Sequence, residues 1–465
     1  MTNASALFYN SNSQIKDTLY RKITITPSDE QYEEQMTRWN DLAEYLKENL
    51  KTESGLNVNS WLQGSYKFKT QIRPTNTSEE FDIDLGVYFE VEKKPTEEKY
   101  SPKNLKRMIQ QCLKNYAALH TDEILKVDDP AKERCARIHF PGNFHIDVPC
   151  YYEIPDTKKT ELATEANIWE DSDPEIFYNW FQNSFSDSER EVARRIIKYT
   201  KCWSGISFVN QKKGGRPSSM LIMVLVTQAL LDSPKNIFEL YDDEILAAVL
   251  GKILQRLRSS SKVNNPVNDK ECLSDRIEDF DVFLSELESF VKIAFDALNC
   301  SSAIDAVAKW QLAFHHFIPM LDEEETAKSI NNSLVPYSFD PKIEITAKYN
   351  NSVISSGINK IGPIPKNCSI TFQIANESQI PAGSSIQWTV RNFGSDSEYV
   401  NDIGHLAGNS TSVERKSAYN GTRYMDCLIT RNNQVIGSKR ATVEIKGNPI
   451  PKRNPPKRSW VKFNK

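Results

Sequence analysis

The chain has 465 residues, of which 39% are hydrophobic and 26% are charged, and its formal net charge is −4. This length suits about three domains, and the composition is that of a globular protein. A protein that binds nucleic acid through its overall charge should be clearly basic, so the balance argues against a nucleic-acid-coating role. A local basic cleft remains compatible with this net charge.

The sequence shows neither a targeting signal nor a metal-binding cysteine pattern. Its N-terminal segment lacks the basic and apolar parts of a secretory signal, and the most apolar stretch, residues 220–231, is too short to cross a membrane. The eight cysteines include no CxxC pair. We therefore expect a cytoplasmic protein with reduced thiols and no membrane partner.

The first part of the chain changes from a helical to a strand-like pattern. A long helix is predicted to begin with Thr26 as its cap and Pro27 at its first position. Its apolar residues recur at spacings of three and four: Tyr32, Met36, Trp39, Ala43, Leu46 and Leu50. Between residues 57 and 155 the apolar residues alternate instead, in 81–90 and in the pair 137–140 and 144–148, which a Pro-Gly-Asn turn joins.

The pattern returns to helices in residues 172–325. Asp173-Pro174 and Ser186-Asp187 are expected to begin two of them, and residues 220–231, apolar all round, predict a buried central helix. Residues 242–257 and 275–298 are amphipathic, with a polar loop between them. From residue 341 several short alternating segments predict a β-sandwich, followed by a basic, Pro-rich tail that we expect to be extended.

Three aspartates are the strongest candidates for chemistry. Asp82 and Asp84 project from the same face of a strand whose other face is apolar, and Asp147 lies in a second strand of the same kind. Taken alone, such a strand is more often an edge strand with a solvated polar face. If the two strands are neighbours, the three carboxylates converge and suit two Mg²⁺ or Mn²⁺ ions for phosphoryl transfer.

The segment before Asp82 favours a metal site over a solvated edge strand. Gly64-Ser65 can present backbone N–H groups and a hydroxyl to phosphate oxygens, although such a pair alone is usually an ordinary turn. Here it stands 17 residues before Asp82, and Asp147 follows 63 residues after Asp84. The combination is far more specific than any of its parts.

At this point the chain resembles a known family. Its motifs are similar to those of the polymerase-beta-type nucleotidyltransferases, most of all the bacterial CD-NTases of antiphage defence, which are relatives of cyclic GMP–AMP synthase and oligoadenylate synthase. The matching motifs are Gly64-Ser65, Thr70-x-Ile72-Arg73-Pro74, Asp82-x-Asp84, Asp147, Trp169-x-x-Ser172-Asp173-Pro174, Lys198-Tyr199-x-Lys201-x-Trp203 and Pro217-Ser218-Ser219. The resemblance covers residues 25–325.

The resemblance implies roles for these residues. Asp82 and Asp84 would hold both of two Mg²⁺ or Mn²⁺ ions, and Asp147 the ion that activates the attacking hydroxyl.

Other residues would bind the nucleoside triphosphate. Gly64 and Ser65 would grip it, and Ser219 with one of two lysines would meet its outer phosphates. Alignment on Lys-Tyr favours Lys198 and alignment on Lys-x-Trp favours Lys201; three residues apart, both could face one cleft.

The chain differs from the animal relative in one insertion, and its C-terminal region lies outside the nucleotidyltransferase resemblance. The zinc-binding insertion of the animal DNA sensor is absent, which argues against a nucleic-acid activator. The region after residue 341 resembles the C-terminal β sensor domain attached to some of these enzymes.

The expected fold class is α+β, in four parts. Residues 1–165 would form a polymerase-beta-like core with a mixed sheet, and 166–335 an all-helical domain that closes the nucleotide cleft. Residues 341–447 would form a β-sandwich sensor-like domain, and 448–465 the tail.

The resemblance implies a metal-dependent attack of a 3′- or 2′-hydroxyl on the α-phosphate of a nucleoside triphosphate, with release of pyrophosphate. We expect the product to be a short cyclic oligonucleotide, a second messenger that acts through an effector protein in bacterial antiphage defence. A synthase of linear oligonucleotides and a template-independent RNA tailing polymerase are the alternatives. A catalytically inactive nucleotide sensor fits less well, because all three carboxylates are present.

Overall fold

The structure is a computed structural model of the chain. It describes residues 5, 8, 25–76, 78–301, 303–318, 338–432 and 434–447. By their internal contacts the residues divide into two compact units, Met1–Pro319 and Met320–Lys465. The predicted extended tail, 448–465, lies outside the described residues.

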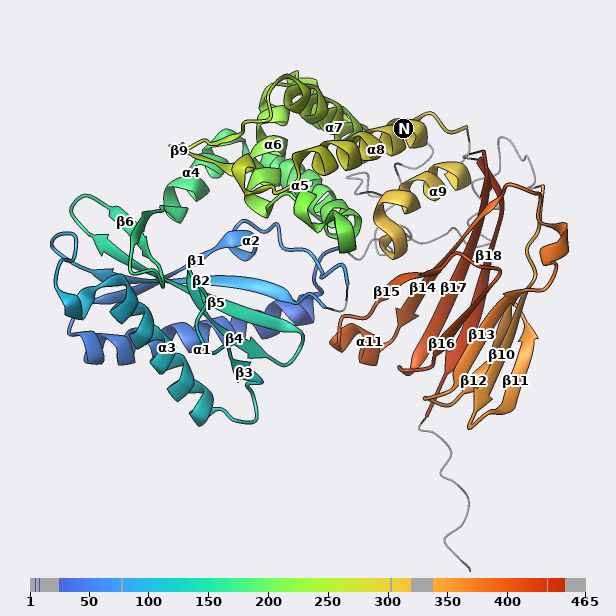
Figure 1. Cartoon of the computed structure of the whole chain (residues 1–465), viewed down its shortest axis with the longest axis horizontal. Helices are drawn as coiled ribbons and strands as arrows, with labels where there is room; N and C mark the ends of the chain where they lie inside the picture. Colours follow the sequence, from blue (N-terminus) through green and yellow to red (C-terminus); the bar gives the residue numbers. More distant parts are fainter. Residues whose placement is uncertain are drawn as a thin grey trace, which may run out of the picture. The chain divides into compact units, whose positions relative to one another are not determined.

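A seven-stranded mixed sheet forms the first part of unit 1 (Figure 1). Its order is β1-β2-β5-β4-β3, with β6 paired to β5 and β7 paired to β6. Strands β2 and β5 are parallel, and the other pairs are antiparallel. The strands are β1 (Val58–Gln63), β2 (Phe81–Glu90), β3 (Lys126–Val127), β4 (Cys135–Phe140), β5 (Phe144–Ile154), β6 (Lys159–Ala163) and β7 (Trp169–Asp171).

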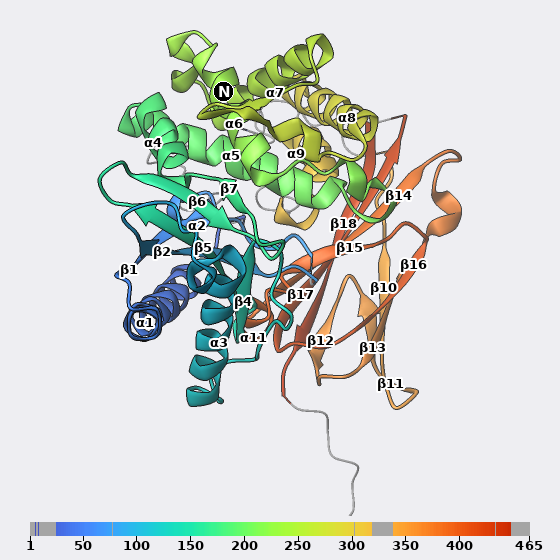
Figure 2. The same cartoon turned by 60° about the vertical axis from the view of Figure 1, so that its left-hand side comes forward.

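One face of this sheet packs on two helices. In both views α1 (Asp29–Ser54) and α3 (Pro102–Leu119) lie on the same side of the sheet (Figure 2). Ile83 and Ile146 point into this core and are fully buried, together with Leu46 and Leu105 from the two helices. Each buried aliphatic side chain contributes about 1.5–3 kcal/mol. Because side chains alternate along a strand, the polar residues between the apolar ones must point to the opposite face.

The first helix begins two residues later than predicted. Its cap is Ser28, whose hydroxyl accepts the Gln31 N–H (3.3 Å), while the Gln31 side chain accepts the Ser28 N–H (3.0 Å). This reciprocal pair satisfies two backbone donors, which Thr26 could not do from its position. The predicted apolar stripe is also wrong at Met36, which is 48% exposed.

The second part of unit 1 is helical and lies on the other side of the sheet (Figure 2). Asp173 and Ser186 cap α4 and α5 as predicted, and α6 is buried on nearly all sides. The helices are α4 (Pro174–Ser184), α5 (Asp187–Ser207), α6 (Ser219–Leu231), α7 (Asp242–Ser259), α8 (Phe280–Leu298) and α9 (Ala303–Phe314).

The segment between α7 and α8 differs from the prediction. Helix α8 begins at Phe280 because Asp279 accepts the Val282 N–H (3.1 Å) and caps it there. The predicted polar loop contains a small hairpin of β8 (Asn264–Asn265) and β9 (Asn268–Cys272). In its turn the Asn265 side chain accepts the Val267 N–H (3.1 Å), a local bond that favours a turn.

Unit 2 is a sandwich of two sheets, as predicted. The four-stranded sheet has the order β11-β10-β13-β16, and the five-stranded sheet β12-β18-β17-β14-β15. Alternate residues such as Trp388, Met425 and Cys427 are fully buried between them. The strands are β10 (Ile343–Tyr349), β11 (Ser352–Ile358), β12 (Lys360–Ile364), β13 (Ser369–Ile374), β14 (Ser385–Phe393), β15 (Gly404–Gly408), β16 (Ser412–Lys416), β17 (Gly421–Arg431) and β18 (Gln434–Ile445).

The cysteines agree with the expectation of reduced thiols. All eight cysteines are free thiols, and six of them are buried. Among the described residues, none of the helices combines the length and the apolar character needed to cross a membrane.

Candidate active site

The three predicted aspartates come together on the polar face of the sheet in unit 1. Asp84 of β2 and Asp147 of β5 are directly paired across the two parallel strands, and Asp82 is paired with His145 in the same register. All three aspartates line one pocket. The strands that carry them are therefore neighbours, which the alternating pattern left open.

The three carboxyl groups have different electrostatic surroundings. Burial, with the charges of Asp82 and Asp147, raises the pKa of Asp84 well above its usual value. Burial acts in the same direction on Asp82, but His145, Arg137 and Lys201 together outweigh it and lower the pKa of Asp82. The Asp82 side chain is 49% exposed, and the solvent that it meets is that of the pocket.

This set of donors fits divalent cations of the Mg²⁺ type. Such ions prefer carboxylate oxygens, and added positive charge stabilises the ionised form of Asp84, whose pKa burial and the other two carboxylates raise. The ligands would be Asp82, Asp84 and Asp147.

Arg137 is a site residue that was not identified from the sequence. On β4 it lies opposite Asp147 and binds it with two bonds, Nε to Oδ1 (2.5 Å) and Nη2 to Oδ2 (2.6 Å). The sequence did contain a signal that could have identified Arg137. A three-residue turn that pairs Phe140 with Phe144 also pairs Arg137 with Asp147 across the hairpin. Arg137 holds the Asp147 carboxylate in one orientation.

Gly64 packs directly against the Asp84 carboxylate. Its φ is +57°, a backbone conformation that favours glycine, and a Cβ at this position would lie 1.8 Å from Asp84 Oδ2. No other residue can stand here without moving Asp84. Gly64 and Ser65 both line the pocket at the start of the short helix α2 (Gly64–Lys67).

The two candidate lysines have different positions. Lys201 lines the pocket and donates from Nζ to the Thr70 carbonyl (3.0 Å). Burial lowers its pKa to about 8, although Asp82 and Asp84 act in the opposite direction. Lys198 also has a pKa lowered by burial to about 8, but it is not among the residues that line the pocket. Ser219, in the first turn of α6, does line it.

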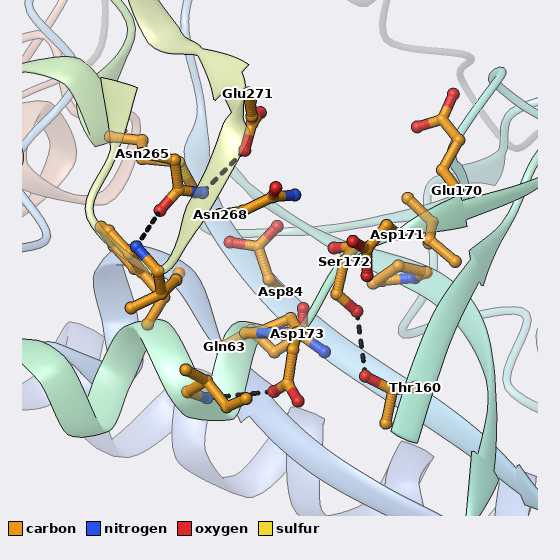
Figure 3. A pocket seen from close by; sticks show the side chains of 18 of the residues that line it. Gln63, Asp84, Thr160, Glu170, Asp171, Ser172, Asp173, Asn265, Asn268 and Glu271 are labelled. Atoms are coloured by element: carbon orange, nitrogen blue, oxygen red, sulfur yellow. Dashed lines mark hydrogen bonds between the residues drawn. The ribbon is translucent and has the colours of Figure 1, made fainter. Parts of the chain in front are cut away.

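The pocket has a volume of about 990 Å³, at the upper end of the range for small-molecule sites. Figure 3 shows Asn265, Asn268 and Glu271 of the β8–β9 hairpin on one side and Glu170, Asp171 and Ser172 on the other, with Gln63, Asp84 and Asp173 between them. The hairpin was missed because its polar sequence resembles an ordinary surface loop. The structure therefore adds a wall of amide and carboxylate side chains to the predicted site.

Comparison with known proteins gives two family matches. Residues 58–151 match the family described as "Cyclic GMP-AMP synthase DncV-like, nucleotidyltransferase domain". Residues 324–446 match the "Adenylyl/Guanylyl and SMODS C-terminal sensor domain". The first region contains the three aspartates and Gly64-Ser65, and the second contains the sandwich of unit 2.

Individual relatives extend these matches to most of the chain. The chain is 30% identical over 452 residues to the cyclic GMP-AMP synthase of Escherichia albertii, and the match covers 96% of each protein. It is 22% identical over 301 residues to the c-di-GMP synthase of Roseivirga ehrenbergii, over 57% of this chain and 74% of the relative.

A solved structure supports the fold. The chain resembles Vibrio cholerae DncV cyclic AMP-GMP synthase in complex with the linear intermediate 5′ pppA(3′,5′)pG, with a TM-score of 0.56 at 20% sequence identity. The likeness covers 69% of this chain and 98% of that one. It confirms the predicted α+β fold with a polymerase-beta-like core.

Proposed function

The chain belongs to the CD-NTase family of DncV-like nucleotidyltransferases, and from this premise we propose that it joins two nucleoside triphosphates into a cyclic dinucleotide. The observation that carries the proposal is the pairing of Asp84 with Asp147 across β2 and β5, with Gly64 packed against Asp84. The relatives named as cyclic GMP-AMP and c-di-GMP synthases support a cyclic product.

Each side chain has a role that follows from its position. Asp82, Asp84 and Asp147 would hold two Mg²⁺ or Mn²⁺ ions, which when bound supply positive charge at the attacking and leaving oxygens. Gly64, with its close backbone approach, would contact the triphosphate.

The triphosphate would also meet side chains from both parts of unit 1. Ser65 and Ser219 offer hydroxyl groups, and Lys201 offers a charge-assisted hydrogen bond. Lys201 is better placed for this than Lys198, because only Lys201 lines the pocket.

Formation of a ring requires two joining steps. In each step a ribose hydroxyl attacks an α-phosphate and pyrophosphate leaves, so the first step yields a linear intermediate and the second closes the ring. A pocket of about 990 Å³ supports the simultaneous presence of two nucleotides. We propose that the product is a second messenger that acts through an effector protein in antiphage defence.

The test is to incubate the protein with labelled ATP, GTP, CTP and UTP in magnesium, with and without an acceptor RNA, and to analyse the products by mass spectrometry. We expect a small product that resists phosphatase, because a ring has no terminal phosphate, and no such product from Asp84→Asn. A phosphatase-sensitive small product would instead indicate a linear oligonucleotide synthase. A lengthened RNA would indicate a tailing polymerase.

A further inference from the structure

A second polar cluster lies beside the aspartates on the same face of the sheet. Its members are His139 of β4, His145 of β5 and Glu80, which directly precedes β2; one ligand atom from each lies within 4.8 Å of the others. The two histidines are cross-strand partners, two pairs along the hairpin from Arg137 and Asp147 and on the same face. Both histidine side chains are only 8% exposed.

Every ring nitrogen of this pair faces a carboxylate. The Nδ1 atoms of His139 and His145 both lie 2.8 Å from the same oxygen, Oε2 of Glu80. The Nε2 atoms lie near different carboxylates: that of His139 is hydrogen-bonded to Asp128 Oδ1 (3.1 Å), and that of His145 is 3.0 Å from Asp82 Oδ1 without hydrogen-bond geometry.

Neutral histidines cannot satisfy these four contacts. A neutral imidazole carries one N–H, so two of them donate only two hydrogen bonds. If both Nε2–H groups donate to Asp128 and Asp82, two Nδ1 lone pairs and a Glu80 oxygen converge with no proton between them. A divalent cation at this point would accept both lone pairs and the carboxylate oxygen.

The geometry offers a cation the donors that it needs, because one nitrogen of each ring meets the same carboxylate oxygen in a largely buried site. A metal-bound histidine characteristically donates its other ring N–H to a carboxylate. Both histidines here have a carboxylate in that outer position.

We propose that Glu80, His139 and His145 form a zinc-type metal site that is distinct from the aspartate site. Two imidazole nitrogens and one carboxylate oxygen, with a fourth position for water, are donors that Zn²⁺ accepts, whereas Mg²⁺ prefers oxygen ligands alone. The ion would hold His145 in place, and His145 would in turn orient Asp82. The site does not depend on the proposed reaction.

The test measures metal binding and not turnover. The full chain is freed of metal with a chelator, supplied with excess Mg²⁺ to occupy the aspartates, and titrated with Zn²⁺ and with Co²⁺, whose absorption reports nitrogen coordination. His139→Gln removes one ligand without touching the aspartates, and Glu80→Gln removes another. Asp84→Asn tests the aspartate site, and His405→Gln removes a histidine of unit 2 whose side chain is 43% exposed.

We expect one Zn²⁺ or Co²⁺ per chain in the unaltered protein, in Asp84→Asn and in His405→Gln. His139→Gln should bind at least about tenfold more weakly, and Zn²⁺ should raise the melting temperature of the unaltered protein but not of this variant. If circular dichroism shows that His139→Gln is unfolded, Glu80→Gln decides in its place. Equal affinity in the unaltered protein and the deciding variant, binding lost only in Asp84→Asn, or no binding at all would overturn the proposal.

Discussion

At the scale of single residues, the pocket carboxylates differ in the partners that they have. Asp82 contacts His145 and Asp147 contacts Arg137, whereas Asp84 has no cationic hydrogen-bond partner within the described part of the chain. A carboxyl group with a raised pKa in the folded state destabilises the fold once the pH exceeds its unfolded value. Without metal, the charged Asp84 therefore lowers the free energy of unfolding. The proposed metal site nevertheless needs this carboxylate as a ligand.

The Asp84→Asn variant should lose turnover and gain thermal stability without metal. At pH 7 the substitution removes a charge that is disfavoured by burial and by Asp82 and Asp147. We expect the melting temperature in EDTA to rise by a few degrees, since about 1 kcal/mol corresponds to roughly 2–4 °C in a chain of this kind. Calorimetry measures it.

Asp82→Asn provides the matched comparison. The pKa of Asp82 is lowered overall, because His145, Arg137 and Lys201 together outweigh burial, so its charge stabilises the fold above the unfolded pKa and this stability is lost on protonation. The variant should therefore melt no higher than the unaltered protein. A higher melting temperature for Asp82→Asn than for Asp84→Asn would contradict this assignment.

The two lysines provide a second prediction at this scale. Lys201→Ala should weaken binding of a non-hydrolysable triphosphate by roughly tenfold or more, because a hydrogen bond to a charged group contributes about 1.5–3 kcal/mol. Lys198→Ala is the control, since Lys198 has a similarly lowered pKa but does not line the pocket. Titration calorimetry distinguishes them; a larger loss for Lys198→Ala would reverse the assignment.

At the scale of elements, the β4–β5 and β8–β9 hairpins of unit 1 differ in how well they can be predicted from their sequences. The β4–β5 hairpin has alternating apolar residues and a compact turn, so its register follows from the sequence. The β8–β9 hairpin is short and polar, and its pairing depends on bonds such as that from Asn265 Nδ2 to Glu271 Oε2 (2.7 Å). Period-two patterning cannot identify such a hairpin.

The β8–β9 hairpin should influence which nucleotides are used. Asn268 lines the pocket and can offer its amide to a base or a ribose. We expect Asn268→Ala to change the relative use of the four nucleotides by roughly two- to tenfold, as suits one neutral hydrogen bond, and to leave the melting temperature nearly unchanged. Competition assays with all four nucleotides measure this.

Asn49→Ala is the control for this experiment. Asn49 is exposed on α1 and does not line the pocket. An unchanged nucleotide preference in Asn268→Ala, or an equal change in Asn49→Ala, would remove the hairpin from substrate selection.

At the scale of the whole molecule, each unit has its own buried core. The core of unit 2 includes residues from both of its sheets, and all residues of the pocket belong to unit 1. Each unit therefore has the separate hydrophobic core that an independently folding domain requires.

A fragment of residues 1–340 should fold and bind nucleotide. We expect cooperative unfolding and an affinity for a non-hydrolysable triphosphate close to that of the full chain, because no pocket residue is removed. If unit 2 senses a ligand, the fragment should differ in regulation or product output. Aggregation of the fragment, or loss of nucleotide binding in calorimetry, would show that unit 2 is a structural brace.

The sequence by itself determined the features that depend on neighbouring residues. Alternation placed Asp82 and Asp84 on one face, and the caps at Asp173 and Ser186 marked two helix starts, because backbone geometry and local hydrogen bonds decide both. The motif spacings also carried the resemblance to the family.

Only the tertiary structure decided which distant segments meet. Residues three apart on a helix lie only about 60° apart in direction, so the spacing allowed Lys198 and Lys201 to face one cleft together and could not show that only one of them enters the pocket. The parallel pairing of β2 with β5 and the approach of the β8–β9 hairpin depend on packing summed over many residues far apart in the chain. For the same reason the cluster of Glu80, His139 and His145 becomes visible only when three strands are placed side by side.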